Sequence, residues 1–435
     1  MHTYNICTNC LQPSPTFNSH PIPHTQVTTH PNSPPSIMTT IPPQDQPLKL
    51  NWKTTPPIDH LPSLNFINWP ALAIYASTTR HKLDGISSPS HLSPEYTMGG
   101  LHVVRRINFA DGTQWLARVQ RKKPTAELRE KMRGEVATMQ VVRARSQIPV
   151  PRVYAWDDNG TVSKVGAGVM LMEFVLGNTA MDSFGGWDIH RGELPDGAKQ
   201  RFLGQMAGVQ VEMAGVRFAR IGSVVRRDDE RFDVGPIPGI GGPFDTAGEF
   251  FEAWADSGLA KYPYKEEMIR ERTPANLVEE VLEAIRGFPK GLGDLARWFP
   301  FREGPFPLIH TDLYCSNVII DGEGKILSVI DWEGAMVGPW ELVEFNKELL
   351  VVPSVMDGPV YKETEARTAL LLAQKEYVEV VHREEKKRGF DTRLSEVLAD
   401  EEVQALALAF WLYGDGRIGC YDRVLAQLDH RQKKS

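Results

Sequence analysis

The stretch HTDLYCSN at residues 310–317, followed by VIDWE at residues 329–333, decides how this 435-residue chain is interpreted. Asp312 and Asn317 are five positions apart, and Asp331 follows a short apolar segment further on. In phosphoryl transfer, one aspartate accepts a proton from the attacking hydroxyl group, while an asparagine oxygen and a second carboxylate hold magnesium ions on the nucleotide. A small set of oxygen ligands suits Mg²⁺, which keeps several waters and also binds phosphate oxygens. We therefore expect a phosphoryl-transfer site at these three residues.

The segments around the two motifs predict a hairpin that brings the second aspartate back beside the first. Four short pieces carry this prediction, namely apolar strands at residues 306–309, 318–320 and 326–330 and the turn sequence DGEG at residues 321–324. Turns of this composition join antiparallel strands. Asp331 is therefore expected beside Asp312 and Asn317, although it lies fourteen positions beyond Asn317.

Each of these residues also has a simpler interpretation when it is taken alone. His310 could only brace the loop, Asn317 could cap a turn, and Asp331 could cap a helix. A motif is confirmed by its structural context. The presence of the motif residues together with both strands favours a site over the separate structural roles.

The two motifs together resemble those of the aminoglycoside phosphotransferase family, over about residues 95–430. The pattern is most similar to a broad branch common in fungi, whose small-molecule substrates are mostly unassigned. The resemblance implies an α+β, two-lobed protein-kinase-like fold, with a small antiparallel-sheet N-lobe and a larger, mainly helical C-lobe. It also implies that Asp312 is the catalytic base and that Asn317 and Asp331 bind magnesium. We count His310 with Asp312 among the catalytic residues, where it would brace the loop.

A kinase-like N-lobe needs a glycine-bearing turn over the nucleotide phosphates. Gly99 and Gly100 precede residues 101–109, which alternate like a half-buried strand, and Asp111-Gly112 predicts the hairpin turn that follows. A plain turn is the alternative for the glycine pair, which is not the GxGxxG loop of protein kinases. Both interpretations of the glycine pair remain open.

The N-lobe also needs a strand cation for the phosphates and a helix glutamate that holds this cation. Arg118 stands where such enzymes usually place a lysine, and its planar guanidinium also suits phosphate oxygens. The fungal branch often has arginine here, whereas a surface arginine is the simpler alternative. Residues 127–146 predict a helix on which Glu135 is the preferred partner of Arg118 and Glu130 the second choice.

A buried strand at residues 168–177 ends at a glycine. By the resemblance, this strand leads into the hinge between the lobes, and backbone groups near Glu173 and Phe174 recognise adenine. The residues themselves indicate only an apolar strand that stops. The assignment of contacts to the base therefore rests on the resemblance alone.

Composition is typical of a globular enzyme, with 41% hydrophobic residues, 24% charged residues and a formal net charge of −7. The negative charge argues against a nucleic-acid binder, and no apolar run is long enough to span a bilayer. Four cysteines are too few for a disulfide framework, and the Cys7–Cys10 CxxC lacks a second pair for zinc. We expect a cytoplasmic protein whose oligomeric state the sequence leaves undetermined.

The sequence divides into four predicted regions. These are a disordered tail rich in proline, serine and threonine at residues 1–60, a partly helical extension at 61–94, a nucleotide-binding N-lobe at 95–175 and a catalytic, substrate-binding C-lobe at 176–435. The tail has neither the arginines of a mitochondrial presequence nor the apolar core of a secretory signal. Helices are predicted at residues 71–76, 197–214, 365–387 and 394–413.

These observations favour an ATP- and Mg²⁺-dependent phosphotransferase that acts on a hydroxyl group of a small molecule. The residues that follow Asp331 could form an acidic and aromatic surface for an amine-bearing acceptor, and they are Trp332, Glu333, Trp340, Glu341 and Glu344. The alternative is that both tryptophans are packing anchors and that Glu341 begins a helix.

Two other functions remain open. A catalytically silent nucleotide-binding scaffold, or pseudokinase, is favoured by the departure at Arg118 from the usual lysine. A protein kinase is disfavoured, because no DFG or APE motif and no recognisable activation segment accompany Asp331.

Overall fold

The computed structural model describes residues 50, 52–58, 61–186, 197–299, 302–358 and 362–432. These residues all belong to one compact unit, Leu50–Ser435. The part of the predicted tail at residues 1–49 lies outside the described residues, as do Cys7 and Cys10.

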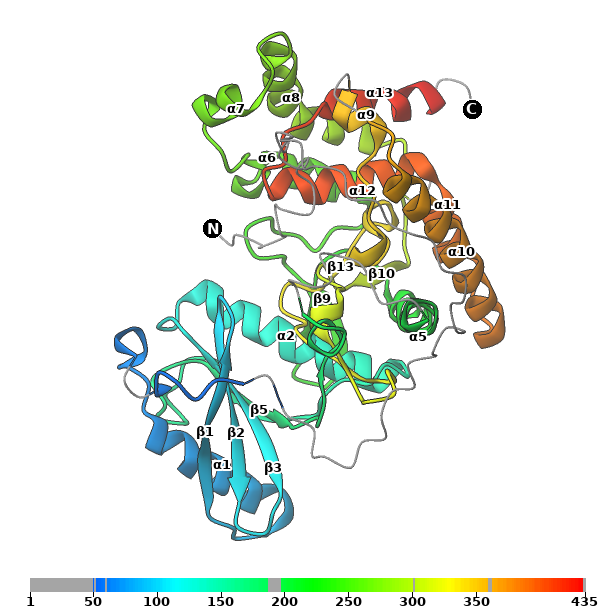
Figure 1. Cartoon of the computed structure of the whole chain (residues 1–435). Coiled ribbons are helices and arrows are strands. Elements are labelled where there is room, and N and C mark those ends of the chain that lie inside the picture. Colours follow the sequence, from blue (N-terminus) through cyan, green and yellow to red (C-terminus); the bar gives the residue numbers. More distant parts are fainter. Residues whose placement is uncertain are drawn as a thin grey trace, which may run out of the picture. The chain divides into compact units, whose positions relative to one another are not determined.

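A five-stranded antiparallel sheet forms the N-terminal part of this unit, in the order β1-β2-β3-β5-β4 (Figure 1). Its strands are β1 (Ser90–Met98), β2 (His102–Phe109), β3 (Gln114–Gln120), β4 (Val153–Asp157) and β5 (Val169–Glu173). The strands predicted at residues 101–109 and 113–119 are β2 and β3, and the turn at Asp111-Gly112 joins them. The guanidinium of Arg80 donates to both carboxylate oxygens of Asp111, at 2.8 and 2.6 Å, and so holds this turn.

One face of the sheet packs on α1 (Trp69–Asp84), where Leu72 and Ala76 join Ile107 and Val119 in one apolar cluster. The helix predicted at residues 71–76 lies within α1. Asn68 caps its start by accepting from Ala71 N at 3.1 Å. The opposite face packs on α2 (Ala126–Arg145), whose buried apolar side chains belong to the main apolar core together with those of Met170 and Met172.

The described residues just before position 60 pack on this sheet, although the sequence predicts a disordered tail there. Lys53 and Tyr96 exchange two backbone hydrogen bonds, of 2.8 and 2.9 Å. Ile58 is only 3% exposed and belongs to the same apolar cluster as α1. One buried isoleucine and a two-bond bridge thus tie a segment of low overall hydrophobicity to the fold.

The C-terminal part is mainly helical. Its longer helices are α5 (Ala198–Gly215), α6 (Ala247–Asp256), α7 (Glu266–Arg272), α8 (Val278–Ala296), α10 (Glu365–Arg388), α11 (Arg393–Ala399), α12 (Glu401–Gly414) and α13 (Tyr421–Gln432). The helix predicted at residues 394–413 is two helices. Asp400 separates them, and its side chain caps α12 by accepting from Glu402 N and Val403 N, both at 3.2 Å. A mixed α+β architecture, with an antiparallel sheet followed by helices, is therefore confirmed.

Short strands position the predicted motifs inside this helical part. They are β6 (Asn178–Thr179), β7 (Arg217–Phe218), β8 (Ser223–Arg226), β9 (Phe232–Gly235), β10 (Phe306–Ile309), β11 (Val318–Ile320), β12 (Ile326–Val329) and β13 (Met336–Val337). The predicted hairpin is present, because β11 and β12 pair antiparallel with Val318 opposite Val329. Among the described residues, none of the helices has both the length and the apolar character required to cross a membrane.

Candidate active site

Asp312 and Asn317 lie together in the loop that joins β10 to β11. The side-chain amide of Asn317 donates to the carboxylate of Asp312 at 3.0 Å and to its backbone carbonyl at 2.9 Å. The short 3₁₀ turn η5 (Cys315–Asn317) makes this approach possible, with Asn317 N bonded to Tyr314 O at 2.8 Å. Because the amide nitrogen faces Asp312, the amide oxygen of Asn317 is left for a further partner.

Asp331 reaches the same loop through the hairpin. Ile330 N donates to Asn317 O at 2.9 Å, so the residue before Asp331 is fixed to the first motif. Asp331 has φ +62°, a left-handed conformation that aspartate adopts more readily than most residues. Its side chain is 47% exposed. The carboxylate is thus held near the loop and remains accessible.

His310 braces these two segments, as the motif predicts. The ring is 1% exposed, and Nε2 lies 3.0 Å from the carbonyl oxygen of Ile330. A carbonyl can only accept, so Nε2 carries the proton and donates. Burial lowers the pKa of His310, which favours a neutral ring. His310 therefore links β10 to the end of β12 rather than facing a substrate.

Arg118 lies at the centre of a charged cluster that joins the sheet to the second motif. Its Nη1 contacts Glu135 of α2, so the predicted pairing is present, whereas the second choice, Glu130, is exposed. Its Nη2 contacts Asp331 and lies 3.5 Å from Glu333. We call Arg118, Glu135, Asp331 and Glu333 the Arg118 cluster.

This cluster holds more negative than positive charge. Burial alone would lower the pKa of Arg118, but Glu135, Asp331 and Glu333 outweigh it and hold that pKa above its usual value. Burial, assisted by Asp331 and Glu333, raises the pKa of Glu135 to about 7 in spite of the guanidinium. Because Glu135 is only partly ionised near neutral pH, the carboxylates of the cluster and its one guanidinium leave between one and two negative charges, which a divalent cation would neutralise.

A family comparison matches this part of the chain. The model of the phosphotransferase enzyme family covers residues 104–341, more than half of the sequence and all of the residues in the Arg118 cluster and the loop. The chain belongs to the phosphotransferase enzyme family. The match does not distinguish branches within the family, so the fungal branch stays a prediction. None of the curated proteins that were compared matches the chain.

Solved structures of bacterial proteins are also similar to this family member. A candidate aminoglycoside phosphotransferase of Ralstonia eutropha is 14% identical, with a TM-score of 0.48, and the match covers 85% of this chain and 99% of that one. A macrolide 2'-phosphotransferase of Brachybacterium faecium is 13% identical, with a TM-score of 0.39, and the match covers 83% and 95% of the two chains.

The donor groups of this phosphotransferase-family chain fit magnesium. The amide oxygen of Asn317 and the accessible carboxylate of Asp331 are hard oxygen ligands, and the net negative charge of the Arg118 cluster lies beside them. Within the described ranges, no group of three or more histidine, cysteine, aspartate or glutamate side chains is arranged to hold a metal ion. Two protein ligands completed by phosphate oxygens and water are the usual magnesium arrangement, whereas zinc requires a larger protein set.

The glycine pair forms the turn between β1 and β2. Gly99 N donates to His102 O at 3.0 Å, and Arg121 donates to the carbonyl oxygens of Gly99 and Gly100 at 2.5 and 3.2 Å. A Cβ atom added at either glycine would meet nothing within 4 Å. The space beside the turn is open and its own backbone does not require glycine, so both interpretations of the pair stand.

The predicted adenine contacts lie at the end of β5. Glu173 N donates to Arg152 O at 2.8 Å, and the carboxylate of Glu173 accepts from Arg152 N at 3.0 Å. The ring of Phe174 packs edge-on against Trp52, with centroids 6.2 Å apart. The backbone N–H of Glu173 is therefore already used by the protein, and a base contact at this atom would have to replace a hydrogen bond.

The acidic and aromatic acceptor surface predicted after Asp331 is wrong for four of its five residues. Trp332 and Trp340 are 1% and 0% exposed, and the face of Trp340 is covered by the guanidinium of Arg217 at 4.8 Å. Glu341 is 0% exposed. Glu333 is turned towards Arg118. Both tryptophans are packing anchors, because they lie in the main apolar core and their indole N–H groups donate to backbone carbonyls.

Sequence reasoning missed a second charged cluster, formed by Glu344, Lys347 and Glu348. Lys347 Nζ lies 2.7 Å from Glu344 Oε1, with both side chains about nine-tenths buried. Lys347 N donates to Leu313 O at 3.2 Å, and Glu348 Oε1 accepts from Cys315 N at 2.6 Å. This Lys347 cluster holds the loop that carries Asp312 and Asn317, through Leu313 and Cys315. The spacing of these residues in the sequence did not predict the cluster, because its contacts depend on how η7 (Lys347–Leu349) packs against the loop at Leu313 and Cys315.

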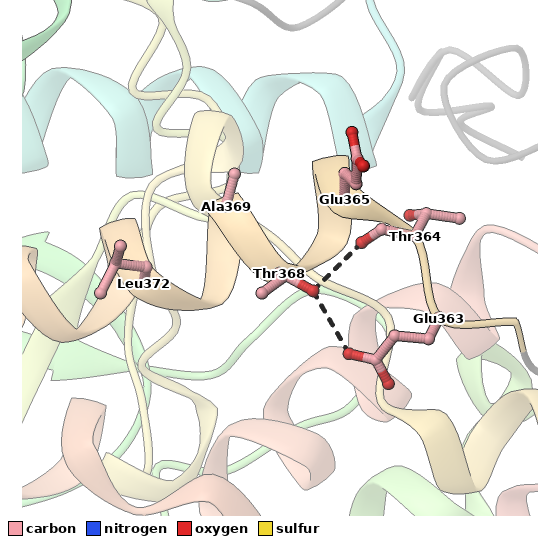
Figure 2. A pocket seen from close by; sticks show the side chains of 6 residues that line it. All are labelled: Glu363, Thr364, Glu365, Thr368, Ala369 and Leu372. Carbon is pink, nitrogen blue, oxygen red and sulfur yellow. Dashed lines mark hydrogen bonds between the residues drawn. The ribbon is translucent and has the colours of Figure 1, made fainter.

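Of two hollows in the described part of the chain, one lies away from the predicted site residues and the other is too small for an acceptor. One of about 540 Å³ lies at the start of α10 and is lined by Glu363, Thr364, Glu365, Thr368, Ala369 and Leu372 (Figure 2). There the single proton of the Thr368 hydroxyl is shared between Thr364 O, at 3.2 Å, and the Glu363 carboxylate, at 3.3 Å. Another, of about 30 Å³, lies behind the loop beside His310, Thr311 and Glu344. It has room for water but not for an acceptor.

Proposed function

We propose that this protein is an ATP- and Mg²⁺-dependent phosphotransferase that transfers the γ-phosphate of ATP to a hydroxyl group of a small molecule. The observation that supports it is the meeting of three segments far apart in the sequence. Asn317 donates to Asp312, Ile330 N ties Asp331 to Asn317, and Arg118 contacts both Glu135 and Asp331. A base, two oxygen ligands and a held cation are what phosphoryl transfer requires.

Each residue then has a defined role. The Asp312 carboxylate accepts the proton of the acceptor hydroxyl, and the hydrogen bond from Asn317 fixes its orientation. Asn317 and Asp331 would hold Mg²⁺, which when bound neutralises charge on the β- and γ-phosphates. Arg118, steadied by Glu135, would contact the phosphates. His310 keeps the loop and the hairpin in register. Positioning and electrostatic stabilisation account for catalysis without a covalent intermediate.

The remaining parts of the proposal concern the lobes and the nucleotide. Residues 95–175 would form the nucleotide-binding lobe, with the Gly99-Gly100 turn over the phosphates and the backbone at Glu173 and Phe174 beside adenine. Residues 176–435 would carry catalysis and acceptor binding. A cytoplasmic location is part of the proposal, because Cys315 and Cys420 are both free thiols, as expected in a reducing compartment.

An amine-bearing acceptor is also part of the proposal. Within the described part of the chain, the Oε2 atom of Glu344 is buried and has no hydrogen-bond partner. Asp312 and Glu344 influence each other electrostatically, and so do Asp312 and Asp415. An acceptor with an ammonium group would find excess negative charge on this side of the catalytic loop.

The test is a phosphate-transfer screen with labelled ATP, Mg²⁺ and a library of small hydroxyl compounds. For an accepted compound, Asp312→Asn should lower kcat by about 10²–10⁴-fold, because it removes the proton acceptor. Nucleotide affinity, measured by calorimetry, should stay unchanged in this variant. Asp331→Asn should instead weaken the Mg²⁺-dependent binding of nucleotide and abolish turnover. Turnover by Asp312→Asn at the wild-type rate would refute the role of the base.

A second candidate function is a catalytically silent nucleotide-binding scaffold. Two observations favour it. Arginine replaces the usual lysine at position 118, and its guanidinium contacts the proposed metal ligand Asp331. The scaffold predicts stabilisation by nucleotide with no phosphorylated product from any acceptor and no ATP hydrolysis. The enzyme predicts hydrolysis that Asp331→Asn abolishes.

A further inference from the structure

Glu333 lies two residues after Asp331 and faces the sheet. Its side chain is 13% exposed, and its Oε2 atom lies 3.5 Å from Arg118 Nη2 and 3.5 Å from His102 Nδ1. His102 belongs to β2 and Arg118 to β3, so one carboxylate from the C-terminal part contacts two neighbouring strands. Burial of Glu333 is costly unless those contacts compensate it.

We infer that Glu333 is a positioning residue for Arg118, and that its carboxylate holds guanidinium Nη2 while Asp331 is engaged by the metal. This inference rests on the proposed function, because it takes Asp331 as a magnesium ligand. It assigns Glu333 to the nucleotide side of the site rather than to the acceptor surface.

The inference follows from the contacts that the two terminal nitrogens of the guanidinium, Nη1 and Nη2, make with carboxylates. Glu135 binds Nη1, whereas Nη2 is shared between Asp331 and Glu333. A carboxylate that binds a metal ion loses much of its attraction for a neighbouring cation, so Asp331 cannot serve both partners fully. Glu333 then remains as the acceptor for Nη2. Without it, the guanidinium would be held at Nη1 alone and could rotate about that contact.

His102 fixes the other side of Glu333. Its ring is 7% exposed, and burial together with the nearby Arg118 lowers its pKa well below the usual value. A neutral ring can donate one N–H to the carboxylate without adding a second cation to the cluster. The ring of His102 therefore lies beside the Glu333 carboxylate, from β2, while that carboxylate faces Arg118.

The same geometry gives a reason for arginine in place of lysine. An ammonium group is a compact point charge, whereas a guanidinium presents separate nitrogens in a planar fork. Two carboxylates on different segments, Glu135 on α2 and Glu333 after β12, match the two ends of that fork. A lysine at position 118 would use Glu135 and gain little from Glu333.

The experiment is a double-mutant cycle on the full-length protein, with affinity for Mg²⁺-ATP as the readout. Glu333→Gln should weaken that affinity about tenfold, equivalent to about 1.4 kcal/mol, with KM for ATP affected more than kcat. In an Arg118→Lys background, the same substitution should change affinity by less than about twofold, because the fork is absent. Glu130→Gln, an exposed glutamate on α2, is the control and should change neither value.

The outcomes separate this inference from the proposed function. Equal affinities of wild type and Glu333→Gln, or an equal loss in both Arg118 backgrounds, would overturn the inference and leave the proposed function in place. Failure of the wild-type protein to bind nucleotide with or without Mg²⁺ would overturn both. If thermal unfolding shows that Glu333→Gln is not folded, Glu333→Asp replaces it. That variant keeps the charge but is one methylene shorter, and it should weaken affinity in the same Arg118-dependent way.

Discussion

The Arg118 cluster and the Lys347 cluster both place one buried cation among several carboxylates, but they differ in how they are built. The Arg118 cluster joins β3, α2 and the end of the hairpin, and its contact with Asp331 spans 213 positions of sequence. The Lys347 cluster comes from a single short segment, with Glu344 and Lys347 three positions apart. The first holds an accessible carboxylate, since Asp331 is 47% exposed, whereas the Lys347–Glu344 pair is about nine-tenths buried.

This difference in exposure indicates that the two clusters have different roles. The paired atoms of a closed ion pair, here Lys347 Nζ and Glu344 Oε1, are out of reach of a ligand, so their contact holds structure. A cluster with an open carboxylate can exchange one of its internal contacts for a metal or a phosphate. We therefore expect substitutions in the Lys347 cluster to change stability and the position of the catalytic loop, and substitutions in the Arg118 cluster to change nucleotide binding.

The largest effect on stability is expected from Lys347→Met. The methionine is of similar length, but it leaves Glu344 buried without its cation, which typically costs about 3–5 kcal/mol. Urea unfolding should show this loss, while the affinity of the folded variant for Mg²⁺-ATP stays within about twofold of wild type. Lys290→Met removes an exposed pair with Asp294 and is the matched control, for which no measurable change is expected.

A second substitution separates buried charge from lost packing. In the double variant Lys347→Met with Glu344→Gln, the uncompensated carboxylate is gone, and part of the lost stability should return. A double variant no more stable than Lys347→Met alone would indicate that packing, rather than charge, dominates. A large loss of nucleotide affinity in either variant would contradict the division between the two clusters.

A smaller effect is expected from Glu348→Ala. Glu348 Oε1 accepts from Cys315 N, and its removal leaves a buried backbone N–H of the catalytic loop without a partner, at about 1–3 kcal/mol. Because this N–H lies between Asp312 and Asn317, kcat should fall more than KM for ATP rises. Glu348→Gln is the matched control, since its amide oxygen can still accept. Activity of Glu348→Gln as low as that of Glu348→Ala would show that the charge, rather than the hydrogen bond, matters.

The sequence predicted those parts of the site that depend on local pattern. The β11–β12 hairpin follows from its turn residues. The Arg118–Glu135 contact was predicted from the strand cation and helix glutamate of a kinase-like N-lobe, on a strand and a helix that local pattern indicates. The break at Asp400 was missed, because the apolar pattern continues across it while a single capping side chain ends one helix and starts the next. A capping residue inside an apolar run was the available signal.

Residues that act through docking could not be found in this way. Glu333 was assigned to an acceptor surface because its neighbours in sequence are acidic and aromatic, yet its direction depends on where two strands of the sheet lie. Glu348 likewise contacts Cys315 across 33 positions, through a 3₁₀ turn with no periodicity to mark it. Such contacts depend on how segments far apart in the sequence pack together. The spacing of residues within one segment does not specify that packing.

The last predicted effect is a pH dependence of stability on the Lys347 side of the molecule. Burial raises the pKa of Asp415 to about 7, with Glu344 and Asp312 adding to the rise and Lys347 opposing it. A carboxyl group with a raised pKa in the folded state binds a proton that the unfolded chain has already released. Its contribution to stability is therefore full below about pH 4 and is lost as the pH rises towards about 7. Asp415→Asn should remove this contribution, so its stability relative to wild type should improve between pH 5 and pH 8. Unfolding measurements at pH 5 and pH 8 test this prediction. If the difference in stability between the two proteins does not change with pH, Asp415 is already ionised in the folded protein at pH 5.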